Sequence, residues 1–374
     1  MKIIIASDSF KGSLTSMEVA DAIEKGILRE TNDVKIKKFS IADGGEGTVL
    51  ALVENLGGEI LEFDVTATMG GKGKGLLGII DKNTAIIETA SPCGLDKLDK
   101  NNLDPNNATS FGLGELILEA LKLNLKKLYI GLGGSSVNDG GMGMAKALGA
   151  KFLDENDREI PKTIRGLGLL RKIDISNLNP ALKNIEIELL SDVKNPLCGK
   201  NGATYVYGPQ KGVKESELEE FDSYLKNYGK LLEKTFNKSI INREGAGAAG
   251  GLGAAFMAFT DCKMTRGIDK ILELSNFEKA VKDCDMVFTG EGKMDFQSVF
   301  GKAPIGVANY AKKYDIPVIA IVGSTGRDIE KVYDYGIDLV LDIINKPMNL
   351  DYAMENAKIL VEKAAYTAMK AKKI

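Results

Sequence analysis

The chain has 374 residues, with 49 lysines and arginines against 52 aspartates and glutamates, no histidine and a formal net charge of −3. This balance lacks the basic excess of nucleic-acid binders, and the absence of histidine excludes histidine-based triads and histidine-ligated metals. Acid–base chemistry must then come from carboxylates, lysines, tyrosines or cysteines, and any metal should be a hard cation such as Mg²⁺.

The cysteines and the first residues indicate where the protein works. Cys93, Cys198, Cys262 and Cys284 lie far apart without a CxxC pair, which suits a reducing compartment. The apolar run that ends at Ala6 is too short for a signal peptide or a membrane span. We therefore expect a cytoplasmic protein that binds neither nucleic acid nor membrane.

The first sixty residues contain two strand–loop–helix patterns. Residues 2–7 have the apolar character of a buried strand, DSFKGS follows as a loop, and a capping box from Thr15 to Glu18 predicts the start of a helix. Residues 34–42 predict a second strand, and the loop DGGEGT leads into a helix that reaches Asn55. These two strand–loop–helix patterns predict a parallel sheet.

The next part of the chain changes character. Short strands are predicted at 59–66, 75–80 and 84–89 with turns between them, as in a β-meander, and a helix at 110–121 follows. At 127–149 a buried strand gives way to a glycine-rich loop and a helix. Because a helix start offers unpaired N–H groups and a partial positive charge, this stretch predicts an anion-binding loop.

The strand rhythm resumes near residue 183 and gives the domain prediction. Strands are predicted at 185–190, 286–289, 318–322 and 339–344. We expect an α/β protein in which 1–60 and 183–374 form one parallel-sheet domain and 61–182 form a smaller inserted α+β domain. Length alone predicts two or three domains.

Several predicted strands end in an acidic residue: Asp8, Asp43, Asp139, Asp192 and Glu291. Ligands bind outside the carboxyl ends of strands in parallel α/β sheets, so several of these carboxylates are expected to meet at one site. Each acid taken singly is also explained as a turn or N-cap residue.

The run from Gly245 to Gly250 matches the dinucleotide motif GxGxxG. The residues before it do not form a clear strand, and the motif is meaningful only between a strand and a helix. A packing or loop role is the favoured interpretation. A nicotinamide-dependent oxidoreductase nevertheless remains one alternative, and a non-enzymatic regulator that binds phosphorylated sugars is another.

The motifs taken together resemble a known family. DSFKGSLTS at 8–16, ADGGEGT at 42–48, GLGGSSVNDGGMGMAKALGA at 131–150, SDVKNPLCG at 191–199, GATYVYGPQKG at 202–212, GAGAAGGLG at 245–253 and GEGKMDFQSVFGKAP at 290–304 are similar to the type I glycerate kinases of bacteria. The resemblance implies a Rossmann-like domain with an inserted domain and ATP-dependent phosphorylation of D-glycerate. The product is expected to be 2-phosphoglycerate, with 3-phosphoglycerate as the alternative.

Phosphoryl transfer needs positioning and charge neutralisation, which glycine loops, lysine and Mg²⁺ supply. We expect catalytic roles for Asp192 as the base, Lys11 and Asp295, with Asp43 and Glu291 holding Mg²⁺. The alternative assignment exchanges Asp192 with Asp295. The expected substrate and phosphate ligands are Asp8, Ser9, Gly133, Gly134, Ser135, Ser136, Asn138, Asp139, Gly140, Lys211 and Lys293. The chain is expected to act as a monomer or homodimer.

Overall fold

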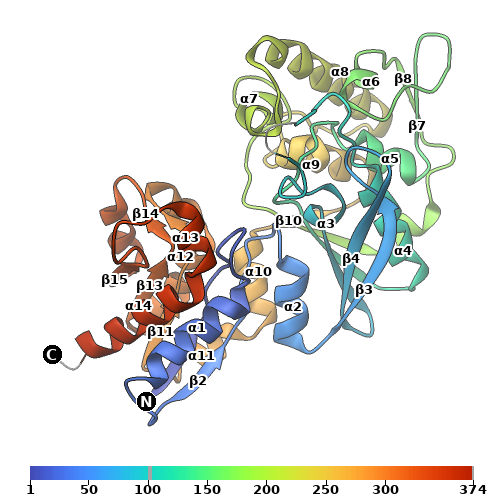
Figure 1. Ribbon diagram of the computed structural model, residues 1–374. Coiled ribbons are helices and arrows are strands. Elements are labelled where there is room, and N and C mark those ends of the chain that lie inside the picture. Colours follow the sequence, from blue (N-terminus) through green and yellow to red (C-terminus); the bar gives the residue numbers. More distant parts are fainter. Residues whose placement is uncertain (100–102, 373–374) are drawn as a thin grey trace. The chain divides into compact units, whose positions relative to one another are not determined.

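The structure is a computed structural model, and it describes residues 1–99 and 103–372. The chain divides into two compact units. Unit 1 comprises Met1–Asp43, Leu50–Gly57 and Ile268–Ile374, and unit 2 comprises Gly44–Val49 and Gly58–Gly267. In Figure 1 the blue and orange-to-red segments form unit 1, and most of unit 2 runs from blue-cyan to yellow.

Unit 1 is built on a parallel sheet with the strand order β15-β13-β11-β1-β2. The strands are β1 (Lys2–Ile5), β2 (Lys35–Lys38), β11 (Met286–Thr289), β13 (Val318–Val322) and β15 (Leu339–Asp342). The prediction that the first strand and the strand at 286–289 share one sheet is confirmed, since Ile4 pairs with Val287.

Helices cover both faces of this sheet because its central strands β1, β11 and β13 are apolar on both sides. Ile3 and Ile5 pack with α1 (Ser16–Leu28) and α14 (Ala357–Ala371), which lie side by side in Figure 1. Ile4 faces the opposite core, which α10 (Gly267–Leu274), α11 (Phe277–Val281) and α12 (Ala303–Lys312) supply. The predicted capping box at Thr15 and Glu18 begins α1.

The remaining elements of unit 1 are short. They are α2 (Thr48–Leu56), most of which belongs to this unit, the small strands β12 (Lys293–Met294) and β14 (Ser324–Thr325), the 3₁₀ helices η4 (Phe296–Phe300) and η5 (Ile329–Tyr335), and α13 (Leu350–Glu355).

Unit 2 contains a mixed sheet with the order β10-β9-β6-β5-β4-β3. Its strands are β3 (Glu59–Thr66), β4 (Lys72–Asp81), β5 (Thr84–Glu88), β6 (Lys127–Gly131), β9 (Glu186–Leu190) and β10 (Lys263–Thr265). The predicted meander is confirmed, because β3, β4 and β5 pair antiparallel. The strands from β5 through β6 and β9 to β10 pair parallel.

The helices of unit 2 enclose one large core. They are α3 (Ala90–Cys93), α4 (Phe111–Lys122), α5 (Met142–Ala147), α6 (Ile164–Leu167), α7 (Ala203–Tyr207), α8 (Leu218–Phe236) and α9 (Ala248–Phe259), with the 3₁₀ helices η1 (Pro180–Asn184), η2 (Pro209–Lys211) and η3 (Glu215–Glu217) and the strand pair β7 (Lys151–Leu153) and β8 (Lys172–Asp174).

The α/β class is correct, but the expected domain boundaries differ from the units. The strand at 185–190 was expected to return to the first sheet, whereas β9 pairs with β6 and β10 in unit 2. Unit 2 therefore extends to Gly267 and is the larger unit, not the smaller one. Strand rhythm identifies a parallel strand but does not say which sheet provides its partner.

Candidate active site

The carboxyl edge of the unit 1 sheet has the geometry of a ligand site. The chain passes from β1 to β2 on one side, while β11, β13 and β15 follow on the other, so the strand order reverses between β1 and β11. Ligands of open α/β sheets bind at such a switch point. The loops after β1 and β11 meet there, since the Asp8 amide donates to the Gly290 carbonyl at 2.9 Å.

Asp8 is half-buried in this place. Its Oδ1 accepts a 2.7 Å hydrogen bond from the Ser9 amide. Burial and the neighbouring charge of Asp43 raise the pKa of Asp8 to about 7, with a smaller contribution from Glu291, while the Ser9 N–H and Lys11 oppose this rise.

Lys11 lies exposed in a tight turn that begins at Phe10. The turn is fixed by reciprocal backbone hydrogen bonds between Phe10 and Leu14, at 2.8 and 2.9 Å, and Gly12 adopts the left-handed φ of +75° that the turn requires. The loop after β11 lies beside this turn, because an added Cβ on Gly292 would lie 3.5 Å from the Phe10 Cα, an ordinary van der Waals distance. The structure therefore brings Asp8, Ser9 and Lys11 together.

Glu291 is buried and already bound. Its carboxylate accepts from the Ser298 hydroxyl and forms a 2.9 Å ion pair with Lys302. Burial raises the pKa of Glu291, and Lys302 opposes the rise. Ser298 and Lys302 thus already bind the carboxylate of Glu291. A Mg²⁺ ion held by Glu291, as the sequence predicts, would have to displace them.

Asp295 and Lys293 follow in the same loop. Asp295 is the N-cap of η4, where its Oδ1 accepts a hydrogen bond from the Gln297 amide at 2.9 Å. The exposed Lys293 stands 3.8 Å from that carboxylate. Asp43 is half-buried after β2, and its charge acts on Asp8.

The glycine loop of unit 2 does not have the open helix start that the sequence predicts. Asp139 is fully buried and accepts from the amides of Gly141 and Gly143 and from both donors of Ser110, at 2.7 to 3.1 Å. The Met144 amide donates to the Ser110 hydroxyl. The N–H groups at the start of α5 are therefore bound within the protein, and a role for this loop in binding phosphate stays a prediction.

The other polar residues of this loop also turn inward. Ser136 donates to the Cys93 carbonyl at 2.8 Å, and the Asn138 amide group donates to the Thr204 hydroxyl at 3.0 Å. Gly140 packs against Tyr228. Of the predicted loop residues only Gly133 and Gly134 reach the surface, so sequence alone overstated how many of them are available to a ligand.

Lys211 is the buried cation of unit 2, 3% exposed. It donates to the Ser135 hydroxyl at 3.0 Å and to the Val137 carbonyl at 2.7 Å. Burial lowers the pKa of Lys211 to about 7, and the charges of Asp139 and Cys93 oppose this shift. The lysine supports the glycine loop from inside and is not presented to solvent.

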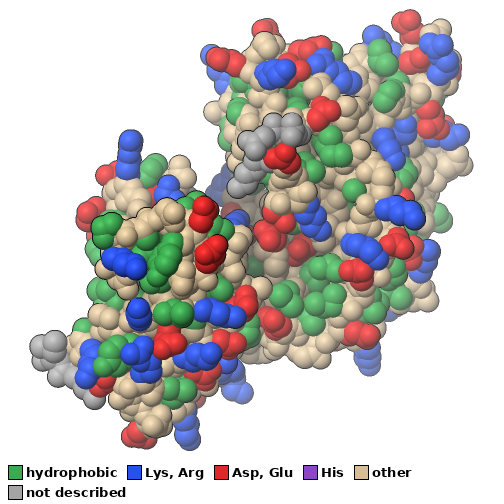
Figure 2. Space-filling view, viewed as in Figure 1, with side chains coloured by type: hydrophobic (Ala, Val, Ile, Leu, Met, Phe, Trp, Pro, Cys, Tyr) green, Lys and Arg blue, Asp and Glu red, His purple; other side chains and the backbone are tan. Residues whose placement is uncertain are grey.

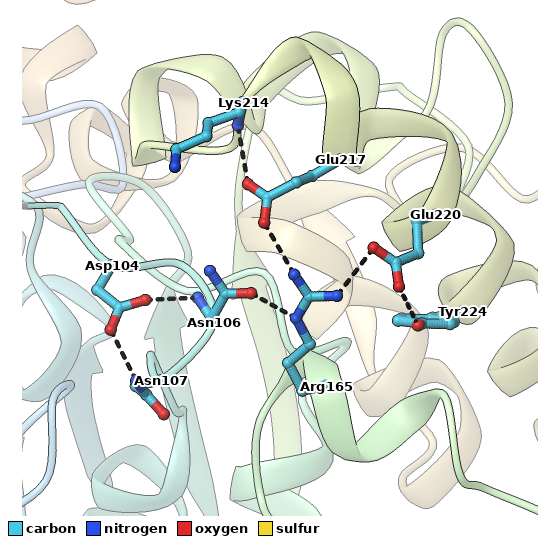
Figure 3. Close-up of polar contacts among 8 residues, drawn as sticks. All are labelled: Asp104, Asn106, Asn107, Arg165, Lys214, Glu217, Glu220 and Tyr224. Atoms are coloured by element: carbon cyan, nitrogen blue, oxygen red, sulfur yellow. Dashed lines mark hydrogen bonds and ion pairs between the residues drawn. The ribbon is translucent and has the colours of Figure 1, made fainter.

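A network of surface side chains holds the connection before α4. This connection lies beside the turn that carries Lys211. Arg165 donates to Asn106 and forms 2.8 Å ion pairs with Glu217 and Glu220 (Figure 3). An added Cβ on Gly212 would lie 2.6 Å from the Leu103 side chain, so the segment and the turn are in contact. These contacts tie the connection before α4 to α6 and α8.

Asp192 follows β9, as predicted, and forms an ion pair with Arg266 at 3.4 Å. Arg266 follows β10, the next strand of the sheet. The two residues occupy the carboxyl edge of the parallel strands of unit 2. Asp192 therefore belongs to unit 2, whereas Asp8, Asp43, Glu291 and Asp295 belong to unit 1.

Sequence reasoning missed Glu88 and Arg266. Glu88 ends β5, is 5% exposed, and accepts from the amides of Gly47 and Val49. Burial raises the pKa of Glu88 to about 7, and these N–H groups oppose the rise. The rule that selected the other strand-end acids applies equally to Glu88. For Arg266 no comparable signal exists, because its place follows from the pairing of β10.

The GxGxxG run has a packing role. The run continues into α9 without a strand before it, and the Gly250 carbonyl accepts from the Gly140 amide at 3.0 Å. An added Cβ on Gly250 would lie 2.1 Å from the Val137 carbonyl oxygen. The motif is a close contact with the glycine loop, which removes the structural basis for a dinucleotide site.

Positive and negative side chains are interspersed on the face of the protein shown in Figure 2. Among the residues that the structure describes, none of the helices combines the length and apolarity needed to span a membrane. The same residues contain no cluster of three or more acidic or cysteine side chains that could hold a metal.

The fold and the strand-end sites define a two-unit α/β protein with polar groups at the carboxyl edges of its sheets. The chain belongs to the glycerate kinase family, whose model matches residues 3–373. It is 45% identical to the glycerate 2-kinase of Escherichia coli (strain K12), over 96% of this chain and 94% of the relative. It is 44% identical to the glycerate kinase of Bacillus subtilis (strain 168), over 98% and 96%.

A solved structure from Salmonella typhimurium LT2, whose proposed identity is glycerate kinase 2, has the same fold. The TM-score is 0.85 at 41% identity, with 100% of this chain and 98% of the other covered.

Proposed function

We propose that this protein transfers the γ-phosphoryl group of ATP to the 2-hydroxyl of D-glycerate. The observation that carries the proposal is the 45% identity to a glycerate 2-kinase over nearly the full length of both chains. The loop pair at the switch point of the unit 1 sheet supports it, because the exposed cation Lys11 lies there with the carboxylate of Asp8. The protein would work in the cytoplasm as a monomer or homodimer.

Mg²⁺ would accompany ATP and neutralise charge on its phosphates. It usually takes only one or two protein carboxylates with phosphates and water, so the donors of unit 1 fit it without a larger acidic cluster. Asp43 is the carboxylate that we assign to it. Glu291 is a weaker candidate because Lys302 and Ser298 already bind its oxygens.

The assignment of Asp192 as the base, with Asp295 as its alternative, stays a prediction. General base catalysis is worth about 10²–10⁴-fold in rate, so loss of a true base lowers kcat by that factor with little change in KM. The ion pair with Arg266 and the N-cap role of Asp295 are arguments against these two residues.

The decisive assay incubates the purified protein with ATP, Mg²⁺ and D-glycerate and follows ADP. ADP release that depends on glycerate supports the kinase. Reduction of NAD with glycerate would support an oxidoreductase, and binding without either reaction would support a regulator. Separating 2-phosphoglycerate from 3-phosphoglycerate in the product tests which hydroxyl is phosphorylated.

A further inference from the structure

The carboxylates at the strand ends differ in the hydrogen-bond donors and cations that already bind them. Bound ones are Asp139 with its four donors, Asp192 with Arg266, Glu291 with Lys302 and Ser298, and Asp295 as an N-cap. Asp8 accepts one hydrogen bond, at Oδ1 from the Ser9 amide. Within the described part of the chain no donor or cation binds its Oδ2. Asp8 therefore keeps an oxygen available for a substrate proton.

We propose that Asp8, in place of Asp192, is the general base of the phosphoryl transfer, an inference that rests on the proposed kinase function. As the substrate hydroxyl oxygen bonds to the γ-phosphorus of ATP, the bond from that phosphorus to the β–γ bridging oxygen breaks. ADP leaves with the bonding electron pair. The hydroxyl proton passes to the Asp8 carboxylate and then to solvent.

The backbone holds Asp8 firmly at the switch point. The Asp8 amide donates to the Gly290 carbonyl at 2.9 Å, and the buried Ser16 hydroxyl donates to the Ser7 carbonyl at 2.6 Å. An added Cβ on Gly290 would lie 2.9 Å from the Ser7 hydroxyl, so the two loops are in close contact. A base fixed in this way loses little rotational freedom when a substrate arrives.

Charged residues from three loops surround Asp8. Asp43 follows β2, Glu291 follows β11, and Lys11 lies in the same loop as Asp8.

The test compares Asp8→Asn with Asp192→Asn in the full chain. We expect Asp8→Asn to lower kcat by roughly 10²–10⁴-fold, with the KM for D-glycerate changed by less than about threefold. Asp192→Asn, which removes the alternative base, should lower kcat by less than Asp8→Asn does, and the reverse order would return the role to Asp192. Asp334→Asn, at an exposed position, controls for loss of a carboxylate elsewhere.

Three results would overturn the assignment. The first is an Asp8→Asn variant whose kcat stays within a few-fold of the parent. The second is a variant whose activity returns at raised Mg²⁺, which would make Asp8 a metal ligand. The third is loss of circular dichroism signal, which would make its role structural. If the unmodified protein releases no glycerate-dependent ADP, the kinase function itself fails and the base assignment fails with it.

Discussion

Lys211 illustrates at the scale of one residue how burial changes chemistry. Most lysines of this chain lie at the surface, but Lys211 is 3% exposed and binds only neutral oxygens, those of Ser135 and Val137. Desolvation lowers its pKa from the ordinary 10.5 to about 7. The folded protein therefore releases a proton near neutrality that the unfolded chain keeps up to about pH 10.

This difference predicts a pH-dependent stability. Between pH 7 and 10 the unfolded chain binds the extra proton, so the free energy of unfolding rises with pH in that window. Lys211→Met removes the effect. We expect the unfolding free energy of the parent minus that of Lys211→Met to grow by about 3 kcal/mol between pH 7 and 9.5 in urea titrations. Lys214→Met, exposed near the same turn, should show no such growth. An equal difference at both pH values would contradict the shifted pKa.

At the scale of elements, the start of α5 is bound by one carboxylate. Asp139 accepts from the amides of Gly141 and Gly143 and from Ser110, which precedes α4. The residue joins two helix starts inside the core of unit 2. A polar glycine loop can thus be an internal scaffold, although its composition is the same as that of a ligand loop.

Asp139→Asn tests this interpretation. The amide NH₂ replaces an acceptor and meets N–H donors, leaving at least one buried donor unpaired, so we expect a loss of about 2 kcal/mol in unfolding free energy. The KM values of the folded variant should stay within about threefold of the parent. Asp154→Asn, whose carboxylate lies in an exposed turn with Arg158, serves as the control. A large rise in KM without loss of stability would restore the ligand role.

At the scale of the molecule, the chain forms two units with separate cores. The core of unit 2 is one cluster, and unit 1 has a cluster on each face of its sheet. The chain enters and leaves unit 2 more than once, so unit 1 is assembled from distant segments. Each unit buries its own apolar residues, which favours local changes in stability.

A matched pair of cavity variants measures this independence. Leu128→Ala lies in the core of unit 2, and Leu272→Ala lies in a core of unit 1. Loss of a buried leucine side chain costs about 2–5 kcal/mol. Hydrogen exchange followed by mass spectrometry should show faster exchange mainly in the unit that carries the substitution. Equal acceleration in both units by either variant would show that they unfold together.

Local patterns predicted much of the fold. The capping box at Thr15 and Glu18, the meander of β3 to β5 and the parallel pairing of β1 with β11 are all present. These features depend on neighbouring residues or on a strongly apolar strand, so the sequence carries them directly. The position of β9 was not predictable in this way, because its apolar run suits either sheet.

For the candidate site too, some features were predictable from the sequence and others were not. The amino-acid sequence by itself determined the absence of histidine chemistry, the resemblance to glycerate kinases, and the acids at the strand ends. Only the tertiary structure decided which of those acids are already bound: Asp139 by backbone amides, Glu291 by Lys302, and Asp192 by Arg266. The physical reason is that residue type sets what a side chain can do, whereas its hydrogen-bond partners, burial and pKa arise from residues distant in the chain that folding brings into contact.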